Sequence, residues 1–82
     1  MVLVDVYVPA VDKEYNFSLN EDVKVSVLIE EISEMIGQKE QTRLYGDISS
    51  LNLVSKEKES ILPNEASLSE CGVRTGAGLI LV

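Results

Sequence analysis

The residues of this chain that are able to do chemistry are few, and the first is a single thiol at Cys71. A cysteine acts as a nucleophile when a histidine or a nearby cation activates it. The chain has no histidine, Glu70 beside the thiol opposes the thiolate, and Arg74 is the one cation close in sequence. Because free cysteines are usually small buried hydrophobic residues, we interpret Cys71 as structural.

Three carboxylates, Glu30, Glu31 and Glu34, have a spacing that would suit a metal or an acid/base pair. Such runs mostly solvate the outer face of a helix, and without a cleft nothing raises the pKa of such a group. A zinc site is excluded because the chain has no cluster of Cys and His. No catalytic residue, cofactor site or metal site is therefore assigned.

The charge of the chain restricts its partners. Its 82 residues hold 7 Lys and Arg against 14 Asp and Glu, a net charge of −7. Nucleic acids and anionic membrane surfaces repel such a chain. With no basic leader and no long apolar run, neither a signal peptide nor membrane insertion is expected, so the predicted location is the cytoplasm. The length suits a single domain over residues 1–82.

The elements that position these residues begin with strict alternation of side-chain type. Valines occupy every second position over residues 2–8 until Pro9, and apolar residues alternate with polar ones over 15–19. This period of two is typical of strands, and the short separation predicts an antiparallel hairpin.

The period then changes to that of a helix. The helix is predicted to begin between Asp22 and Ser26, either of which can cap it, and to end at a left-handed cap on Gly37. One face of it is apolar and the other carries glutamates. The apolar positions are Val25, Leu28, Ile29, Ile32, Met35 and Ile36.

The second half predicts shorter elements. Ser67 and Glu70 have the spacing of a capping box around a brief helical turn. Gly76 and Gly78 are expected to take positive φ in a tight turn before the last strand. The expected elements are a turn at 45–47, a strand at 51–54, an exposed charged turn at 56–59, a strand at 61–62, a short helix at 67–73 and a strand at 79–82.

This order, β-β-α-β-β-short helix-β, is that of the β-grasp, and the spacing resembles ubiquitin outside residues 38–58. The matching intervals are those of Leu19, Val25, Leu28, Ile32 and Gly37, and those of Leu62, Leu68, Val73, Leu79 and Val82. The resemblance implies an α+β, ubiquitin-like fold in which a mixed sheet packs on one helix. It also puts Cys71 near the edge of the core.

Among ubiquitin-like proteins, the chain is similar to the bacterial YukD/EsaB family, whose short members are associated with type VII (WXG100, ESX-like) secretion. The similarity rests on two segments and on the abrupt apolar ending. The segments are Leu68-Ser69-Glu70-Cys71-Gly72-Val73, where ubiquitin has Leu-Ser-Asp-Tyr-Asn-Ile, and Val54-Ser55-Lys56-Glu57-Lys58.

Ubiquitin and its sulfur-carrier relatives act through a flexible C-terminal Gly-Gly, because only glycine lets the backbone lie flat in the channel of an adenylating enzyme. Here the sequence ends at Val82, inside the last predicted strand. Neither conjugation nor sulfur transfer is therefore expected. An enzyme or sulfur carrier remains an alternative only for a native terminus that carries Gly-Gly.

Alternation also predicts what the outer face of the sheet carries. If the first and last strands are central neighbours and the third lies beside the last, as in ubiquitin, four apolar residues share an exposed surface. They are Tyr7, Val54, Ile80 and Val82. This surface is a candidate partner-binding site, with Tyr7 as its best anchor. Strand propensity alone also explains these residue types, and this alternative stays open.

The functional hypothesis is a non-catalytic protein-binding module, an accessory or regulatory component on the cytosolic side of a type VII secretion apparatus. Its partner is a protein, with no nucleic acid and no cofactor. The alternative is a generic ubiquitin-like adaptor or assembly subunit unrelated to secretion. An exposed apolar sheet face is compatible with a monomer or a weak homodimer.

Overall fold

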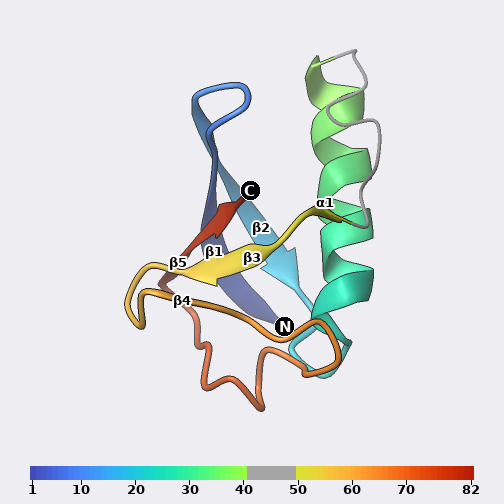
Figure 1. Ribbon diagram of the computed structural model, residues 1–82. Coiled ribbons are helices and arrows are strands. Elements are labelled where there is room, and N and C mark those ends of the chain that lie inside the picture. Colours follow the sequence, from blue (N-terminus) through green and yellow to red (C-terminus); the bar gives the residue numbers. More distant parts are fainter. Residues whose placement is uncertain (41–49) are drawn as a thin grey trace.

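The computed structural model describes residues 1–40 and 50–82, and Figure 1 shows a helix beside a twisted sheet. The predicted hairpin, helix and three later strands are all present, with strand bounds shifted by one or two residues. The turn predicted at 45–47 lies outside the described residues. In chain order the elements are β1 (Val2–Val8), β2 (Lys13–Leu19), α1 (Val25–Glu40), β3 (Leu53–Ser55), β4 (Ser60–Ile61) and β5 (Ala77–Leu81).

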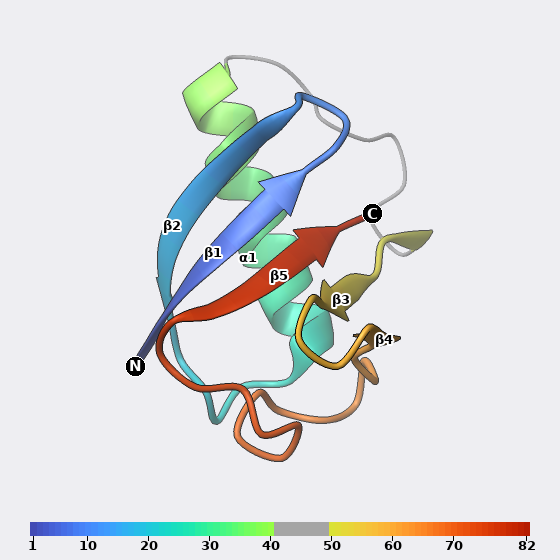
Figure 2. The same cartoon turned by 90° about the vertical axis from the view of Figure 1, so that its left-hand side faces the viewer.

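The strands form one mixed sheet in the order β2-β1-β5-β3-β4. β1 pairs antiparallel with β2 and parallel with β5, while β3 pairs antiparallel with both β5 and β4. Figure 2 shows the strands side by side in this order with α1 behind them. The prediction that the first and last strands are central neighbours, with the third beside the last, is confirmed.

The inner face of the sheet packs against α1, and its side chains are the alternate residues that the period of two selects. Burying a Leu or Ile side chain contributes about 1.5–3 kcal/mol, so this layer holds the fold together. Its buried strand residues are Val4, Val6, Val8, Phe17, Leu19, Leu53, Leu79 and Leu81, and its buried helix residues are Val25, Leu28, Ile29, Ile32 and Ile36.

The margins of the helix differ from the predicted apolar face. Met35 is 36% exposed, because it lies at the edge of the apolar stripe. Ser33, at the opposite edge, is buried, and its hydroxyl has no hydrogen-bond partner among the described residues. The glutamates at 30, 31 and 34 are exposed, as predicted. No helix in the described part of the chain is long and apolar enough to cross a bilayer.

The helix begins within the predicted bounds, but a distant loop caps it. The N–H of Val25 donates to the carbonyl of Ala66 at 2.8 Å, and the N–H of Ser26 donates to the carbonyl of Asn64 at 3.0 Å. These backbone oxygens satisfy the first N–H groups of the helix, which otherwise lack partners. They take the role that the sequence assigned to the side chains of Asp22 or Ser26.

The predicted end of the helix at Gly37 is wrong, because α1 continues to Glu40. The Glu40 carboxylate accepts hydrogen bonds from Lys13 Nζ at 3.0 Å and from the Tyr15 hydroxyl at 2.7 Å. Lys39 Nζ lies 5.5 Å from the centre of the Tyr15 ring. Contacts with β2 therefore stabilise the last turn beyond the glycine.

The predicted short helix at 67–73 is a single turn that is capped at both ends. The N–H of Ser67 donates to the Glu70 carboxylate at 3.0 Å, and the N–H of Glu70 donates to Ser67 Oγ at 3.2 Å, which confirms the capping box. Gly72 has φ +75°, and the N–H of Val73 donates to the carbonyl of Leu68 at 2.9 Å. This is a Schellman ending, so the turn does not continue.

Candidate binding surface

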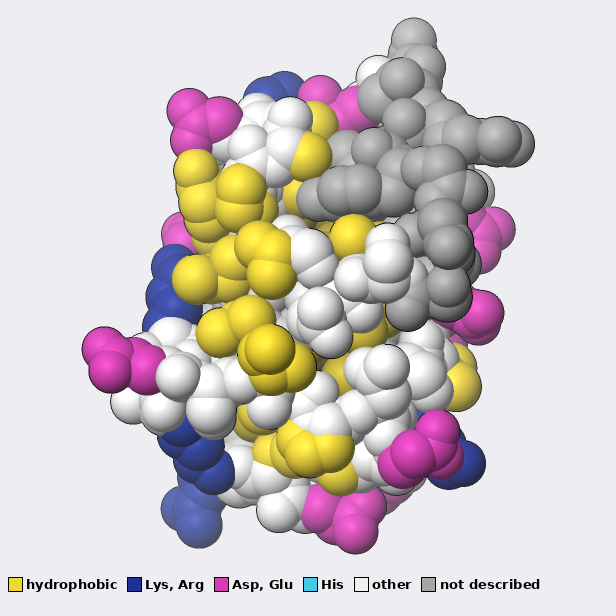
Figure 3. All heavy atoms as spheres, viewed as in Figure 1, with side chains coloured by type: hydrophobic (Ala, Val, Ile, Leu, Met, Phe, Trp, Pro, Cys, Tyr) yellow, Lys and Arg dark blue, Asp and Glu magenta, His cyan; other side chains and the backbone are white. Residues whose placement is uncertain are grey.

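The outer face of the sheet, which points away from α1, carries a row of apolar side chains across four strands. Tyr7 of β1 lies opposite Ile80 of β5, and Ile80 also lies opposite Val54 of β3. Val54 in turn lies opposite Ile61 of β4. Side chains at opposed positions on one face contact each other, so we define these four residues as the outer row. In Figure 3, hydrophobic side chains gather on the left half of the view, with charged side chains at its margin.

The structure brings together three of the four predicted surface residues, because Tyr7, Val54 and Ile80 all belong to the outer row. Val82 lies beside the row, two residues beyond Ile80, and is 46% exposed. Its backbone exchanges hydrogen bonds of 2.6 and 3.0 Å with Asn52, so the alternation of side chains continues to this residue. That these residues bind a partner stays a prediction.

Ile61 is the member of the outer row that sequence reasoning missed. It is 61% exposed, whereas its neighbour Leu62 is buried. Two apolar residues in sequence have no alternation to show which one points outward. The available signal is the charged turn at 56–59, since a four-residue turn places residue 55 opposite 60 and residue 54 opposite 61, as observed.

The hydroxyl of Tyr7 is engaged within the chain. It donates a hydrogen bond of 2.5 Å to Asp12 Oδ1, across the turn that joins β1 and β2. This hydrogen bond, helped by partial desolvation and by the charge of Asp12, raises the pKa of Tyr7, because ionisation would remove the donor and add a second negative charge. Tyr7 therefore offers its ring to a partner more readily than its hydroxyl.

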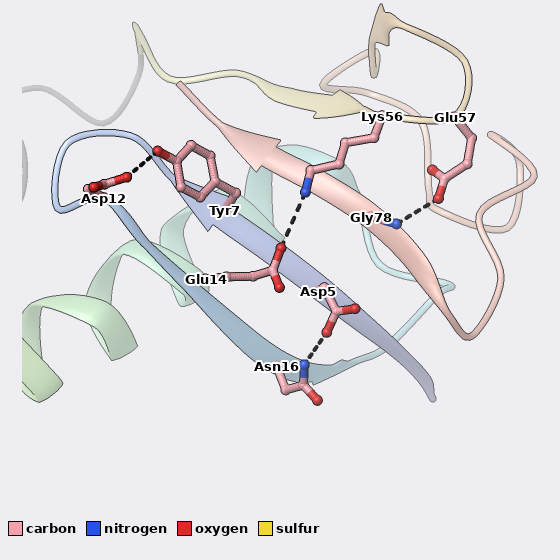
Figure 4. A network of polar contacts seen from close by, with 8 residues as sticks. All are labelled: Asp5, Tyr7, Asp12, Glu14, Asn16, Lys56, Glu57 and Gly78. Atoms are coloured by element: carbon pink, nitrogen blue, oxygen red, sulfur yellow. Dashed lines mark hydrogen bonds and ion pairs between the residues drawn. The ribbon is translucent and has the colours of Figure 1, made fainter.

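Lys56 extends across the outer face from β3 toward β2. Its Nζ lies 3.2 Å from a Glu14 carboxylate oxygen and 5.9 Å from the centre of the Tyr7 ring. The Lys56 side chain passes over Gly78, where an added Cβ would stand 2.9 Å from Lys56 Cδ. Figure 4 shows the Lys56 side chain together with the Tyr7–Asp12 contact and the hydrogen bond between Asp5 and Asn16. The Lys56 side chain thus covers part of the outer row.

The two glycines before and within the last strand have different roles. Gly76 has φ +97°, as predicted for a turn. Gly78 was expected to have positive φ too, but it belongs to β5 and is absent from the positive-φ residues of the described chain. It makes room for Lys56, and its N–H donates to the Glu57 carboxylate at 2.9 Å, which lowers the pKa of Glu57.

Cys71 lies apart from the outer row. It is partly buried and packs against the core, as the resemblance to ubiquitin implied. Its backbone carbonyl accepts a hydrogen bond from Lys58 Nζ. The contact ties the capped turn at 67–73 to the turn between β3 and β4.

A known protein family matches almost the whole chain. The family described as "WXG100 protein secretion system (Wss), protein YukD" matches residues 3–81. No curated protein matches this sequence significantly. Solved structures, in contrast, match its fold.

Those structures are ubiquitin-like domains. An N-terminal ubiquitin-like domain determined in solution superimposes with a TM-score of 0.76 at 22% identity, covering 99% of this chain and 72% of that one. A ubiquitin-like domain from Arabidopsis thaliana has a TM-score of 0.73 at 17% identity, covering 99% and 74%. The corresponding domain of Plasmodium falciparum Dsk2 has a TM-score of 0.70 at 19% identity, covering 99% and 97%. These values show an α+β, ubiquitin-like β-grasp, as predicted.

Proposed function

The chain belongs to the YukD family of the WXG100 protein secretion system, and from this membership we propose that it is a non-catalytic protein-binding module of that apparatus. It acts on the cytosolic side as an accessory or regulatory component. The outer row, together with Val82, is its docking surface. The observation that carries the proposal is the register that aligns Tyr7, Ile80, Val54 and Ile61 across four adjacent strands.

The exposure of this row supports a binding role. Monomeric proteins rarely expose a contiguous apolar patch without a use for it. The row includes an aromatic ring, which offers a large contact area with few rotatable bonds. Ile61 and Val82 are 61% and 46% exposed, so a partner reaches them without any rearrangement of the fold.

The polar groups of the outer face support a role other than catalysis. Tyr7 pairs with Asp12, and Lys56 pairs with Glu14. They lie on an open sheet face, where water surrounds a bound molecule and weakens any electrostatic effect on a reaction. Such groups orient a protein partner better than they activate a substrate.

The test is capture of partners from the lysate of the source cell with three forms of the chain. One is the wild type, one is the double variant Ile61→Glu/Val82→Glu, and one is Met35→Glu. Met35 is an exposed apolar residue on the helix side, so it controls for one of the two added charges. Circular dichroism first establishes that both variants are folded.

We expect the wild type and Met35→Glu to retain a component of the secretion apparatus, and Ile61→Glu/Val82→Glu to lose it. Retention by all three forms would move the site away from the outer face. Retention of proteins outside the apparatus alone would favour the generic ubiquitin-like adaptor. An intact-mass measurement of the native protein tests separately whether it is conjugated.

A further inference from the structure

The length and direction of the outer row restrict what lies on it. Tyr7 and Ile61 are separated by three spacings between neighbouring strands, which is about 14 Å. About ten residues of helix, close to three turns, span this distance. An extended peptide on this face would meet side chains and leave its own N–H and C=O groups unpaired, whereas a helix pairs them internally. The geometry therefore favours a helix that crosses the strands.

The charges around the outer row are mostly negative. Asp5 and Glu14 lie on the same face by register, Asp12 contacts Tyr7, and Glu57 lies beside β5. Lys56 is the single cation among the residues drawn in Figure 4. A second copy of this chain would bring like charges together, because a two-fold interface places each patch against itself. The surroundings fit a partner that carries Lys or Arg beside its apolar face.

Lys56 already occupies the place that such a cation would take. Its Nζ is 3.2 Å from Glu14, and 41% and 51% of the two side chains are exposed. An ion pair this exposed contributes little to stability, so another cation readily replaces it. Its departure uncovers the ring of Tyr7 and the flat backbone at Gly78.

We propose that the outer row binds an amphipathic helix of about three turns with Lys or Arg along its flanks, and that Lys56 holds, in the free protein, the position of a cation of that helix. The apolar side of the helix covers the outer row, and one flanking cation pairs with Glu14. This inference rests on the proposed function, because it names the chemistry of the partner that the same surface receives.

The probe is a stapled helical peptide of about 14 residues with leucines along one side and lysines on both flanks. A second peptide, with glutamates in place of the lysines, is the matched control. Each is titrated into the isotopically labelled chain, and backbone amide shifts locate the contact. We expect the lysine peptide to shift amides around the outer row, to weaken with added salt, and to lose binding in Ile61→Glu. The glutamate peptide is expected to bind more weakly.

Two lysine variants distinguish the replacement of Lys56 by a cation of the peptide from a general effect of net charge. Lys56→Gln should tighten binding of the lysine peptide by roughly two- to fivefold, the equivalent of an exposed ion pair. Lys24→Gln removes the same charge from a pair with Glu65 at 2.9 Å, outside the outer row, and should gain less. Equal gains in the two variants would overturn the proposal, and so would tighter binding of the glutamate peptide or shifts confined to the exposed helix glutamates.

The inference and the proposed function fail in different ways. If a secretion component is retained through the outer row while neither peptide binds there, the helix inference is wrong and the proposed function stands. If the lysine peptide binds the outer row while no secretion component is retained, the helix inference stands and the proposed function is wrong. The inference would also be overturned if the free chain associated with itself through the outer row and thereby excluded the lysine peptide.

Discussion

The two faces of the sheet are built from alternate residues of the same strands, yet different forces act on them. On the inner face, Val6 and Leu79 lie opposite each other and are buried beneath α1. On the outer face, the next pair along the same strands, Tyr7 and Ile80, is only half-buried. The contacts around that pair are polar. Lys56 forms an ion pair with Glu14, and the Tyr7 hydroxyl donates a hydrogen bond to Asp12.

The difference bears on how a chain of 82 residues is stabilised. A chain this small buries a limited fraction of its surface, so one apolar layer supplies most of the stability. The side chains of the inner layer are buried between the sheet and the helix. The outer face holds fewer buried side chains and should contribute less to folding. Substitutions on the two faces should therefore have separable effects.

The largest effect is expected from the inner layer. Ile32→Ala removes a fully buried side chain of α1 and should cost about 2–5 kcal/mol of the free energy of unfolding, because a cavity remains. Val54→Ala, on the outer face, should cost about 1 kcal/mol or less. Urea denaturation of both variants measures the contrast. Equal losses would mean that the outer row is part of the core.

The next effect contrasts two glycines. Gly76→Ala should cost about 1–2 kcal/mol through backbone strain, because φ is +97° and, apart from its chain neighbours, no heavy atom of the described residues lies within 4 Å of the added Cβ. In Gly78→Ala the added Cβ lies against the flexible Lys56 side chain, so this variant should cost less than Gly76→Ala. Thermal unfolding ranks the two variants. The opposite ranking would show that the Lys56 side chain is not free to move.

Local patterns were enough to predict most of the inner layer. A period of two identified the inward valines of β1, the helical period identified the buried face of α1, and spacing identified the capping box at Ser67 and Glu70. These features depend on residues that are close in sequence. The expected helix end at Gly37 failed because Glu40 is held by Lys13 and Tyr15, which lie far away along the chain.

The outer face was predicted less completely for the same reason. Alternation placed Tyr7 and Ile80 correctly, but Ile61 joins the row only through its pairing with Val54. The role of Gly78 depends on a side chain from another strand. Sequence patterns reveal which way a strand residue points, whereas contacts across strands decide what covers it.

A smaller effect is expected from Ser33, a buried polar residue of α1. Its hydroxyl lacks a hydrogen-bond partner among residues 1–40 and 50–82. Ser33→Ala removes this group and places a better helix former there, so stability should rise by about 0.5–1 kcal/mol. A loss of stability in Ser33→Ala would show that the hydroxyl is satisfied in solution.

The smallest effect is the dependence of stability on pH, which compares a carboxylate on each side of the sheet. The hydrogen bond from the Gly78 N–H lowers the pKa of Glu57 on the outer side. Hydrogen bonds from the Tyr15 hydroxyl and then from Lys13 lower the pKa of Glu40 at the end of α1. A folded-state pKa below the ordinary value of 4.5 means that each carboxylate contributes stability above that value. This contribution is lost as the pH falls through the folded-state pKa, and it is small because solvent reaches both groups.

Denaturation of Glu57→Gln and Glu40→Gln between neutral and acidic pH tests this sign. Each variant should match the wild type more closely at acidic pH than at neutral pH, because protonation removes the same charge from the wild type. Glu40→Gln should show the larger difference at neutral pH, since Glu40 joins the helix to β2 through two partners whereas Glu57 accepts from one backbone N–H of β5. A larger difference for Glu57→Gln would mean that the outer face contributes to folding as much as the inner one.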